Sequence, residues 1–266
     1  MTRILQISDP HLTIPPEKLC GQVNTLSRLR ATISAVLAAE AAQAPDAVVI
    51  TGDISDNGSP ESYALFRKEI ERLGLPYYVI PGNHDNREAM RSAFGDAAYL
   101  PKTDRLNWVV AQEKMLLIGL DTLIEGEGGG LIDQPTADFL ARALSNAPQK
   151  PALIAMHHPP FDSGIHFMDK IGLKGAGLLQ EVLEHASAKT RIICGHVHNM
   201  MVGSLGDTVA ISAPSPVSSF PVDYRANAPA GFVTRPGGYM LHEWHGAFRS
   251  TEIDLCEADG PFSFRV

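Results

Sequence analysis

Five short apolar runs in this 266-residue sequence each end in a cluster of Gly, Asp, Asn or His, and this repeated pattern constrains the fold most strongly. The runs occupy residues 3–8, 47–51, 76–80, 152–156 and 191–194. Short apolar runs bounded by turn residues are typical of buried strands. Because open α/β sheets place their sites at the carboxyl ends of strands, we expect the polar clusters to meet in one site.

Segments between these runs have the periodicity of helices. Residues 25–43 carry apolar side chains at helical spacing and stop before Pro45, while residues 60–73 follow a cap at Ser59 and end at Gly74. Further elements are expected as helices at 87–94, 133–146 and 175–186, and as hairpins over 106–121, 200–212 and 238–255. Alternating strands and helices predict an α/β protein.

The segment 214–236 is rich in Pro, Ser and Ala and shows no periodicity, which is typical of a loop. No internal repeat or linker divides the chain. We therefore expect one domain with a core at 1–213 and an extension at 214–266. That extension would add strands and a substrate or subunit loop, without folding independently.

Composition excludes several classes of partner. A net charge of −8 would repel polymeric nucleic acid but is compatible with a small anion held by metal. No apolar run reaches the ~18 residues of a membrane span, and the first residues lack a signal-peptide pattern. The three cysteines, Cys20, Cys194 and Cys256, are widely spaced, so we expect them to be reduced. These features predict a cytoplasmic protein.

Side chains that commonly bind metals follow the predicted strands. They are Asp9, His11, Asp53, Asn83, His84, Asp85, His157, His158, His196 and His198. Two neighbouring cations require a bridging carboxylate together with oxygen and nitrogen ligands, and this set supplies all of them. Glycines beside several of these residues allow the backbone to turn sharply.

Taken one at a time, these residues have ordinary structural explanations. Asp53 suits a turn, Asn83 a helix cap and His157 a hydrogen-bonded core position. His196 and His198 lie two residues apart, so in an extended segment both rings would point to the same side. The joint occurrence of five such clusters at strand ends favours a dinuclear metal site.

The order D-x-H, GD, GNHD, HH and GHxH resembles the calcineurin-like metallophosphoesterase superfamily. The five blocks lie at residues 9–11, 52–53, 82–85, 157–158 and 195–198. Within them ISDPH, TGDI, VIPGNHD, MHHPP and CGHVH resemble bacterial class III cyclic nucleotide phosphodiesterases and their glycerophosphodiesterase relatives. The resemblance implies a four-layer α/β fold, a β-sandwich flanked by helices, with a C-terminal hairpin and loop extension.

The resemblance also implies two metal positions that share one carboxylate. The ligands would be Asp9, His11 and His198 at one position, Asn83, His157 and His196 at the other, and Asp53 between them. The implied catalytic residues are His84, Asp53 and Asn83, with His84 contacting the phosphate and assisting the leaving oxygen.

Other residues of the blocks are not ligands in the family pattern. Asp85 is expected to orient His84 or to cap the following helix, and His158 to support the ligands or pack beside them. Histidines outside the blocks are expected to have structural roles, on a helix face or in loops and hairpins: His166, His185, His242 and His245.

The implied chemistry follows from the charge of a phosphodiester. Two cations cancel that charge, lower the pKa of water and support the departing alkoxide. The predicted reaction is in-line attack on phosphorus by a hydroxide bridging two divalent metal ions. Ligation by Asp, Asn and His without thiolate suits Fe, Mn, Zn or Co rather than calcium, and does not choose among these four.

The loops that would select the substrate lie at 12–21, 123–131, 161–174 and 214–236. Members of the resembled family carry a polar or histidine-bearing segment after the last core strand, but the corresponding PSPVSSFPVDYR has no histidine. Ser218, Phe220 and Arg225 are the candidates to take its place. Phe161 and Phe167 have core packing as the alternative to a role in the site.

Three functions compete at this point. The first is hydrolysis of small phosphodiesters, either 3′,5′-cyclic nucleotides or glycerophosphodiesters. The second is a phosphomonoesterase or nuclease using the same metals, of which the acidic charge disfavours the nuclease. The third is a non-catalytic scaffold, which would tolerate missing ligands, whereas every ligand position is filled. We also expect a homo-oligomer, since the hairpin over 238–255 has an edge that can pair across a subunit boundary.

Overall fold

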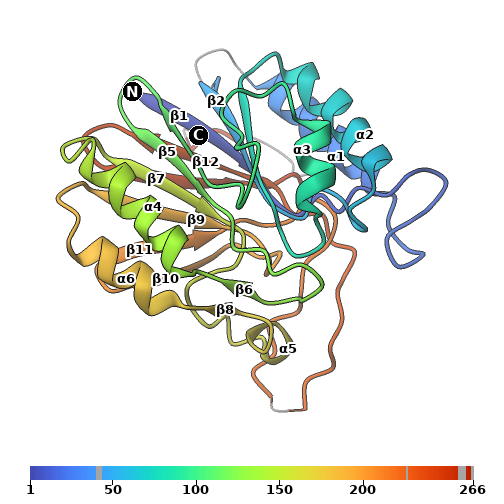
Figure 1. Cartoon of the computed structure of the whole chain (residues 1–266). Helices are drawn as coiled ribbons and strands as arrows, with labels where there is room; N and C mark the ends of the chain where they lie inside the picture. Colours follow the sequence, from blue (N-terminus) through green and yellow to red (C-terminus); the bar gives the residue numbers. More distant parts are fainter. Residues whose placement is uncertain (40–43, 226, 257–261, 265–266) are drawn as a thin grey trace.

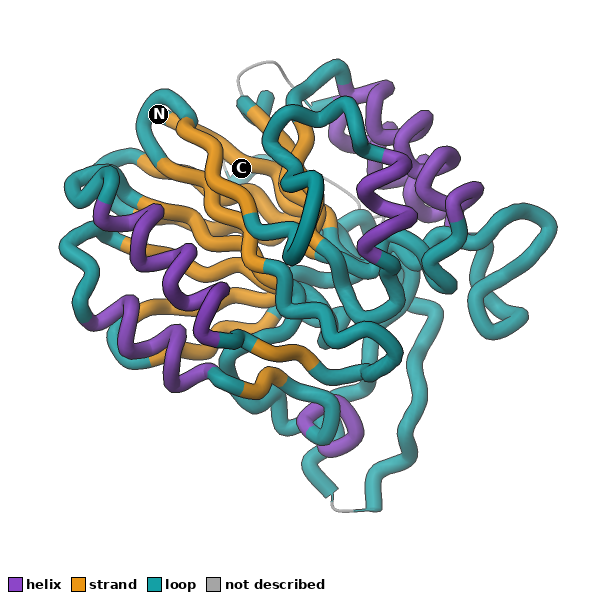
Figure 2. Tube along the Cα trace, in the orientation of Figure 1, coloured by secondary structure: helices purple, strands orange, loops and turns teal. Residues whose placement is uncertain are grey.

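Two β-sheets pack face to face in this computed structural model, which describes residues 1–39, 44–225, 227–256 and 262–264. Helices α1 to α3 lie outside one sheet, and α4 and α6 lie outside the other (Figure 1). The resulting order of helices, sheet, sheet and helices is also visible in Figure 2. This arrangement confirms the predicted helix-flanked β-sandwich.

The first sheet has five strands in the order β13-β12-β1-β2-β3. Its strands are β1 (Thr2–Ile7), β2 (Ala47–Thr51), β3 (Tyr77–Ile80), β12 (Tyr239–Trp244) and β13 (Phe248–Ile253). β1, β2 and β3 run parallel, while β12 is antiparallel to β1 and to β13. One edge of the last hairpin is therefore covered by its own chain, and β13 remains at the edge of the sheet.

The second sheet has six strands in the order β10-β11-β9-β7-β5-β4. Its strands are β4 (Trp108–Ala111), β5 (Leu116–Leu120), β7 (Ala152–Met156), β9 (Thr190–Cys194), β10 (Met201–Leu205) and β11 (Thr208–Ser212). β5, β7, β9 and β11 run parallel, so their carboxyl ends share one edge. The predicted hairpins over 106–121 and 200–212 both form, with shorter strands.

Period-2 alternation in β7 shows how the layers are packed. Leu153 and Ala155 face the first sheet, whereas Ala152, Ile154 and Met156 face α4 and α6. Burial on both faces explains why this strand is apolar throughout. The core between the sheets extends to the buried faces of α1 and α2.

The helices begin close to the predicted positions, but Ser59, the predicted cap of α2, makes no capping hydrogen bond with its side chain. Their bounds are α1 (Thr25–Ala38), α2 (Pro60–Ile70), the 3₁₀ turn η2 (Glu71–Leu73), α3 (Arg87–Ala93), α4 (Gln134–Ser145), α5 (His166–Asp169) and α6 (Ala176–Glu184). Asn24, Asn86 and Asp133 cap α1, α3 and α4 by accepting a backbone N–H, and Gly74 ends η2 in the left-handed conformation. None of the described helices has the length and apolar character that crossing a bilayer requires.

Some boundaries differ from those predicted. The first helix was expected to reach residue 43 but ends at Ala38, and residues 40–43 lie outside the described part of the chain. The loops predicted around 125–130 and 161–174 contain α5 and a small parallel pair, β6 (Gly130–Leu131) with β8 (Leu173–Lys174). Elements of two to four residues carry no detectable periodicity, so the sequence gives no signal for them.

Candidate metal centre

The loops that follow β1, β2, β3, β7 and β9 come together at one edge of the sandwich. Backbone hydrogen bonds join them: Asp9 N–H donates to the Gly52 carbonyl, His11 N–H to the Asp53 carbonyl, and Gly195 N–H to the His157 carbonyl. The predicted site residues are thereby brought into one cluster. Side chains from both sheets contribute to it, because the two sheets meet at this edge.

Five of the predicted ligands have backbone conformations that are unusual for residues other than glycine. Asp9, His11, Asp53, His196 and His198 have φ values of 53°, 40°, 47°, 70° and 53°, in the left-handed region. Such strain concentrates at functional sites, where the surrounding structure holds it in place. The expectation that the two histidines share an extended segment is wrong, and their rings reach two different groups of donor atoms.

The first group, which we call the asparagine group, consists of Asn83, His157 and His196. The Asn83 Oδ1 atom lies 3.1 Å from His157 Nε2 and 3.0 Å from His196 Nδ1. His157 Nδ1 lies 2.8 Å from the Thr51 carbonyl, and His196 Nε2 lies 3.1 Å from the Ile171 carbonyl. Since those carbonyls accept hydrogen bonds, His157 Nδ1 and His196 Nε2 are the donors, and the other nitrogen of each ring faces the Asn83 oxygen.

The second group, the aspartate group, consists of Asp9, His11 and His198. His11 Nε2 and His198 Nε2 are 3.1 Å apart, and Asp9 Oδ1 lies 3.5 Å from His198 Nε2. The other nitrogens of the two rings contact the Asp56 carboxylate at 3.2 Å and the Ser218 hydroxyl at 2.9 Å. The free ends of both rings therefore face each other beside a carboxylate.

Asp53 lies between the two groups. Its Oδ2 atom is 3.5 Å from His11 Nε2 and 3.4 Å from His157 Nε2. Its Oδ1 atom accepts a hydrogen bond from the His84 backbone N–H at 2.9 Å. One oxygen is thus held by the protein while the other is directed toward both groups.

These donor atoms fit divalent cations. Lone pairs of imidazole, amide and carboxylate converge in a buried space, where they repel each other unless a proton or a metal lies between them. The aspartate group and a set of Asp9, Asp53 and His157 each bring their ligand atoms within 4.8 Å of one another. Nitrogen and oxygen donors without a thiolate are typical of a transition-metal site.

The pKa values reflect this crowding of buried charge. Burial disfavours ionisation, yet His157 holds the pKa of Asp53 well below its usual range. Burial also opposes protonation of His157, but the carboxylates of Asp53 and Asp9 raise its pKa to about 9. Burial lowers the pKa of His196 and of His198, so those rings are neutral. A metal ion would take the place of the proton on His157.

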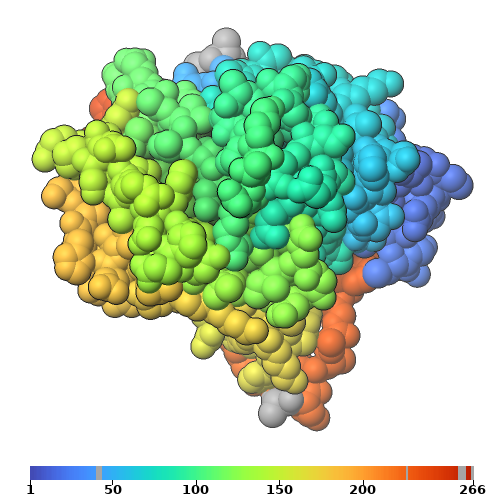
Figure 3. Space-filling view, in the orientation of Figure 1, coloured from blue at the N-terminus to red at the C-terminus, as the bar shows by residue number. Residues whose placement is uncertain are grey.

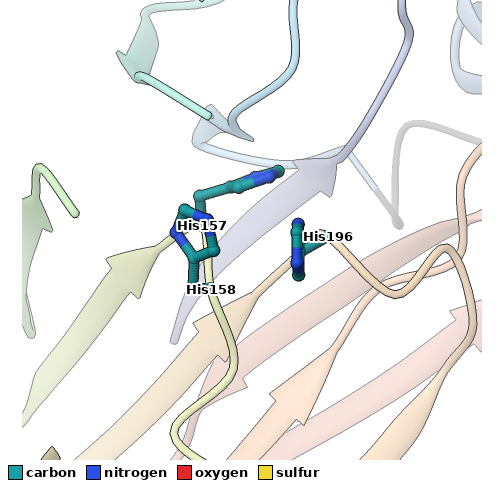
Figure 4. A group of neighbouring side chains, drawn as sticks. All are labelled: His157, His158 and His196. Atoms are coloured by element: carbon teal, nitrogen blue, oxygen red, sulfur yellow. The ribbon is translucent and has the colours of Figure 1, made fainter. Parts of the chain in front are cut away.

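His158 lies beside the asparagine group, and one of its ring nitrogens is within 4.8 Å of ligand atoms of His157 and His196. Figure 4 shows its ring next to those of His157 and His196. Its Nε2 lies 3.1 Å from the Gly128 carbonyl and its Nδ1 lies 2.8 Å from the Thr122 hydroxyl, so both nitrogens are occupied. Burial, with the neighbouring charge of His157, lowers the pKa of His158 to about 3. This histidine is therefore a neutral supporting side chain.

His84 and Asp85 follow Asn83 but differ in their surroundings. The His84 side chain is 41% exposed, and its Nδ1 donates to the Asp56 carbonyl at 2.8 Å, while Nε2 makes no hydrogen bond to the described residues. Asp85 is buried and accepts from the backbone N–H groups of Ile54, Ser55 and Gly82 and from the Tyr63 hydroxyl. The prediction that Asp85 orients His84 or caps the next helix is wrong, because Asp85 joins two loops and Asn86 is the cap.

Two glycines beside the ligands are needed for close approach. A Cβ at Gly82 would collide with the Asp53 carboxylate, and a Cβ at Gly195 would collide with the Ser8 hydroxyl and the Asp9 carboxylate. Neither glycine has a positive φ, so the predicted sharp turn is not their role. Gly52 does turn sharply, with a φ of +90°.

A cavity of about 310 Å³ opens over the donor atoms. Its walls include Leu19, Met168, Ile171, Phe220 and Phe232, which come from three separate loops. Two of these segments, 161–174 in yellow and 214–236 in orange, stand side by side in Figure 3. The predicted substrate-selecting loops at 12–21, 161–174 and 214–236 thus contribute to the cavity, whereas no residue of the fourth predicted loop, 123–131, lines it.

The three candidates from the last of these loops have different positions. Ser218 contacts the ring of His198, and the Phe220 ring stacks on that ring with centroids 4.4 Å apart. Arg225 pairs with Asp223 at the surface and is not part of the cavity wall. Phe167 packs against Phe220, so its aromatic ring supports the wall.

Several residues that hold the ligands were missed by the sequence reasoning. Asp56 contacts His11 with its side chain and His84 with its carbonyl, and its only signal was a second Asp in the loop after β2. The carbonyls of Thr51 and Ile171 have no sequence signal, because every residue has a carbonyl. Outside the site, His242 is buried in β12, while His166 bonds to the Tyr224 carbonyl and His185 to the Glu181 carbonyl.

Comparison with known proteins identifies the family. The sequence model for the calcineurin-like phosphoesterases matches residues 2–200. The chain belongs to this family. Divalent metal binding is typical of this family, and the donor atoms at the ends of β1, β2, β3, β7 and β9 include groups that could hold a metal ion.

Two curated relatives are about one third identical to this phosphoesterase over the aligned residues. A probable glycerophosphodiester phosphodiesterase of Arcobacter nitrofigilis is 34% identical over 83% of this chain and 82% of its own length. A 3′,5′-cyclic adenosine monophosphate phosphodiesterase of Escherichia coli is 32% identical over 74% of this chain and 69% of its own length. The solved structure of a dimetal phosphatase from Danio rerio has a TM-score of 0.66 at 15% identity, covering 96% of this chain and 97% of that one, which shows a shared fold.

Proposed function

We propose that this chain is a metal-dependent hydrolase of small phosphodiesters that binds two divalent cations. The aspartate group would hold one cation, the asparagine group the other, and Asp53 would bridge them. The observation that carries this proposal is the position of Asp53 Oδ2, at 3.5 Å from His11 Nε2 and 3.4 Å from His157 Nε2. A carboxylate oxygen between two sets of lone pairs is the arrangement that a dinuclear centre requires.

The bound metals would cancel the negative charge of the phosphodiester and activate water at neutral pH. The remaining work falls to side chains of the protein. Asp56 accepts the hydrogen bond of His84 Nδ1 and so directs His84 Nε2 into the cavity, where it can contact the leaving oxygen. Asn83 and Asp53 would hold the metals beside this ring. Fe, Mn, Zn and Co all suit these donors.

The cavity favours a small substrate with a single negative charge. At about 310 Å³ it is a size typical of small-molecule sites, and its described walls contain no Lys or Arg. A phosphomonoester carries up to about two charges at neutral pH and is usually bound by Arg or Lys. A diester with one charge therefore suits these walls better. The names of the relatives point to glycerophosphodiesters and 3′,5′-cyclic nucleotides as the first diesters to assay.

Hydrolysis assays test this function directly. Protein stripped with a chelator would be resupplied with Mn, Zn, Fe or Co and given bis(p-nitrophenyl) phosphate, p-nitrophenyl phosphate, 3′,5′-cyclic AMP and a glycerophosphodiester. We expect metal-restored cleavage of diesters with little cleavage of the monoester. Asn83→Ala should abolish the cleavage of diesters, while Asn146→Ala, at the exposed end of α4, should leave that cleavage unchanged. Failure of every metal with every diester would support the scaffold alternative.

We also propose that the enzyme is cytoplasmic. The free cysteines Cys20, Cys194 and Cys256 suit the reducing environment of the cytoplasm. The chain would act as one unit in which 214–266 extends the core at 1–213. The edge strand β13 is available for pairing with a second copy, and a monomer in light scattering would contradict that assembly.

A further inference from the structure

A row of polar side chains begins at Arg191 on β9, passes Ser250 on the edge strand β13 and runs through the core to the metal centre. Its members, in order, are Arg191, Ser250, His242, Gln6, Thr51, Ser8 and Asp9. The four residues between Ser250 and Asp9 are fully buried. The row crosses β12, β1 and β2, three neighbouring strands of the first sheet.

The inner half of the row has a fixed hydrogen-bond direction. Gln6 Nε2 donates to the Cys194 carbonyl at 2.9 Å, which can only accept, and it also donates to the Thr51 hydroxyl at 2.8 Å. Thr51 in turn donates to the Ser8 hydroxyl at 2.7 Å. Ser8 donates to the Asp9 carboxylate. The three hydrogen bonds that link Gln6, Thr51, Ser8 and Asp9 therefore all run toward Asp9, while the second N–H of Gln6 donates to the Cys194 carbonyl.

The outer half follows the same direction. Because Gln6 Nε2 faces Cys194, Gln6 Oε1 faces His242 and accepts from His242 Nε2 at 2.8 Å. His242 Nδ1 must then accept from the Ser250 hydroxyl at 2.8 Å. Burial, with the charge of Arg191, lowers the pKa of His242 to about 3, which agrees with a neutral ring. Arg191 Nη1 donates to Ser250 at 3.3 Å.

The row therefore begins at a cation and ends at a carboxylate, with all donors aligned. Aligned hydrogen bonds polarise one another, and the low dielectric of a core strengthens this effect. An apolar replacement for a buried polar pair is often neutral or stabilising, so core packing alone does not require Gln6 and His242.

The inner end of the row acts on a proposed metal ligand. Ser8 occupies Asp9 Oδ2, while Asp9 Oδ1 lies 3.5 Å from His198 Nε2. The backbone N–H of His196 also contacts both carboxylate oxygens, at 3.0 and 3.1 Å. Ser8 thus leaves Oδ1 as the oxygen directed at the aspartate group, and Thr51 and Gln6 hold Ser8 in that orientation.

We propose that Gln6 and His242 are positioning residues for the metal centre, which act through Thr51 and Ser8 to fix the orientation and charge of Asp9. This inference rests on the proposed function, because it assumes that Asp9 binds metal. Neither residue touches the cavity or the other proposed ligands. Their effect is on metal affinity rather than on contact with the substrate.

The test compares metal affinity with stability in four variants of the full chain. Ser8→Ala, Thr51→Val, Gln6→Met and His242→Leu each interrupt the row at one position. Competition with a chromogenic chelator would measure Mn and Zn affinity, and urea unfolding would measure the stability of the metal-free protein. We expect affinity to fall by about tenfold or more for Ser8→Ala and by progressively less along the row, in the range known for side chains that support ligands.

Two controls separate positioning from packing. Thr208→Val removes a hydroxyl pair between β9 and β11, 3.0 Å apart, that has no connection to the row. We expect it to lower stability without lowering metal affinity. His242→Gln keeps a side-chain donor toward Gln6, so it should recover affinity that His242→Leu loses.

The outcomes distinguish this inference from the function on which it rests. If Asn83→Ala lowers metal affinity while all four row variants bind metal as tightly as the unchanged protein, the row is structural and the inference is wrong. If Asn83→Ala does not lower affinity either, the proposed metal centre itself fails. If Gln6→Met or His242→Leu does not fold, the metal affinity of Thr51→Val provides the test. Valine keeps the shape of threonine, so this variant is expected to fold.

Discussion

The two groups of donor atoms in the metal centre are oriented by different parts of the protein. In the asparagine group, the backbone carbonyls of Thr51 and Ile171 fix the imidazole rings. In the aspartate group, the side chains of Asp56 and Ser218 do so. Asp53 belongs to both groups through one carboxylate oxygen.

This difference determines how each group responds to mutation. A backbone carbonyl persists through any substitution, so the asparagine group is insensitive to changes in the residues that orient its rings. A side chain can be replaced, and a carboxylate on an imidazole increases the basicity of the ring and hence its strength as a ligand. The aspartate group is thus the more easily tuned of the two.

The largest loss of metal binding and activity is expected from Asp53→Ala, which removes the carboxylate that lies between the two groups. Both metal positions should weaken, and diester hydrolysis should fall by at least about 10³-fold because charge stabilisation at the reacting phosphorus is lost. Metal content after dialysis and the rate with bis(p-nitrophenyl) phosphate measure this. Asp138→Ala, on the exposed face of α4, serves as the control. Retention of two metals by Asp53→Ala would contradict the bridging role.

Asp56→Ala should weaken only the aspartate group. Loss of the carboxylate on His11 Nδ1 should reduce affinity at that position by about 10- to 100-fold, with the other position unchanged. Calorimetric titration with Zn or Mn would then resolve two binding steps. Asp56→Asn keeps an acceptor oxygen and should recover part of the loss. Equal weakening of both steps would remove the distinction between the groups.

Metal affinity at the asparagine group should increase with pH. The pKa of His157 is about 9, so the metal-free protein carries a proton on this ring at neutral pH, and metal must displace it. Affinity should therefore rise by about tenfold per pH unit up to a pH of about 9 and level off above it. Titration of Asp56→Ala protein across this range, with proton release followed by calorimetry, isolates the group. A flat profile would be inconsistent with a protonated His157.

Ser218→Ala should have the smallest effect. The hydroxyl on His198 Nδ1 is neutral, so its loss should cost less than about tenfold in affinity, the lower end of the range for such partners. Ser219→Ala provides a matched neighbouring control. Chelator competition measures both variants, and a loss larger than that of Asp56→Ala would reverse the order proposed for the side-chain partners.

Local patterns predicted much of the fold. Apolar runs located β1, β2, β3, β7 and β9, and helical periodicity located several helices, because burial patterns depend on residues close in sequence. The pairing of β12 with β1 could not be predicted, since it joins residues more than two hundred positions apart. The short α5, β6 and β8 were missed because they form only in the context of neighbouring loops.

Prediction of the site was likewise limited to features that depend on residues close in sequence. Residues expected to lie together do lie together, since parallel strand ends share an edge in each sheet and the two sheets meet at that edge. The left-handed backbone of His196 and His198 was not expected, because a His-x-His pair reads as extended when its surroundings are unknown. Asp85 was misassigned, as its partners Ile54, Ser55 and Tyr63 lie in other segments.

The sequence by itself determined which side chains are available for metal binding and that they follow buried strands. Residue types identify the available side chains, and their spacing from the apolar runs shows that they follow buried strands. Only the tertiary structure decided which nitrogen of each histidine faces the metal centre, because that choice depends on the hydrogen bond made by the other nitrogen. For His196 and His198 that bond comes from Ile171 and Ser218, in loops whose own sequence shows no such role.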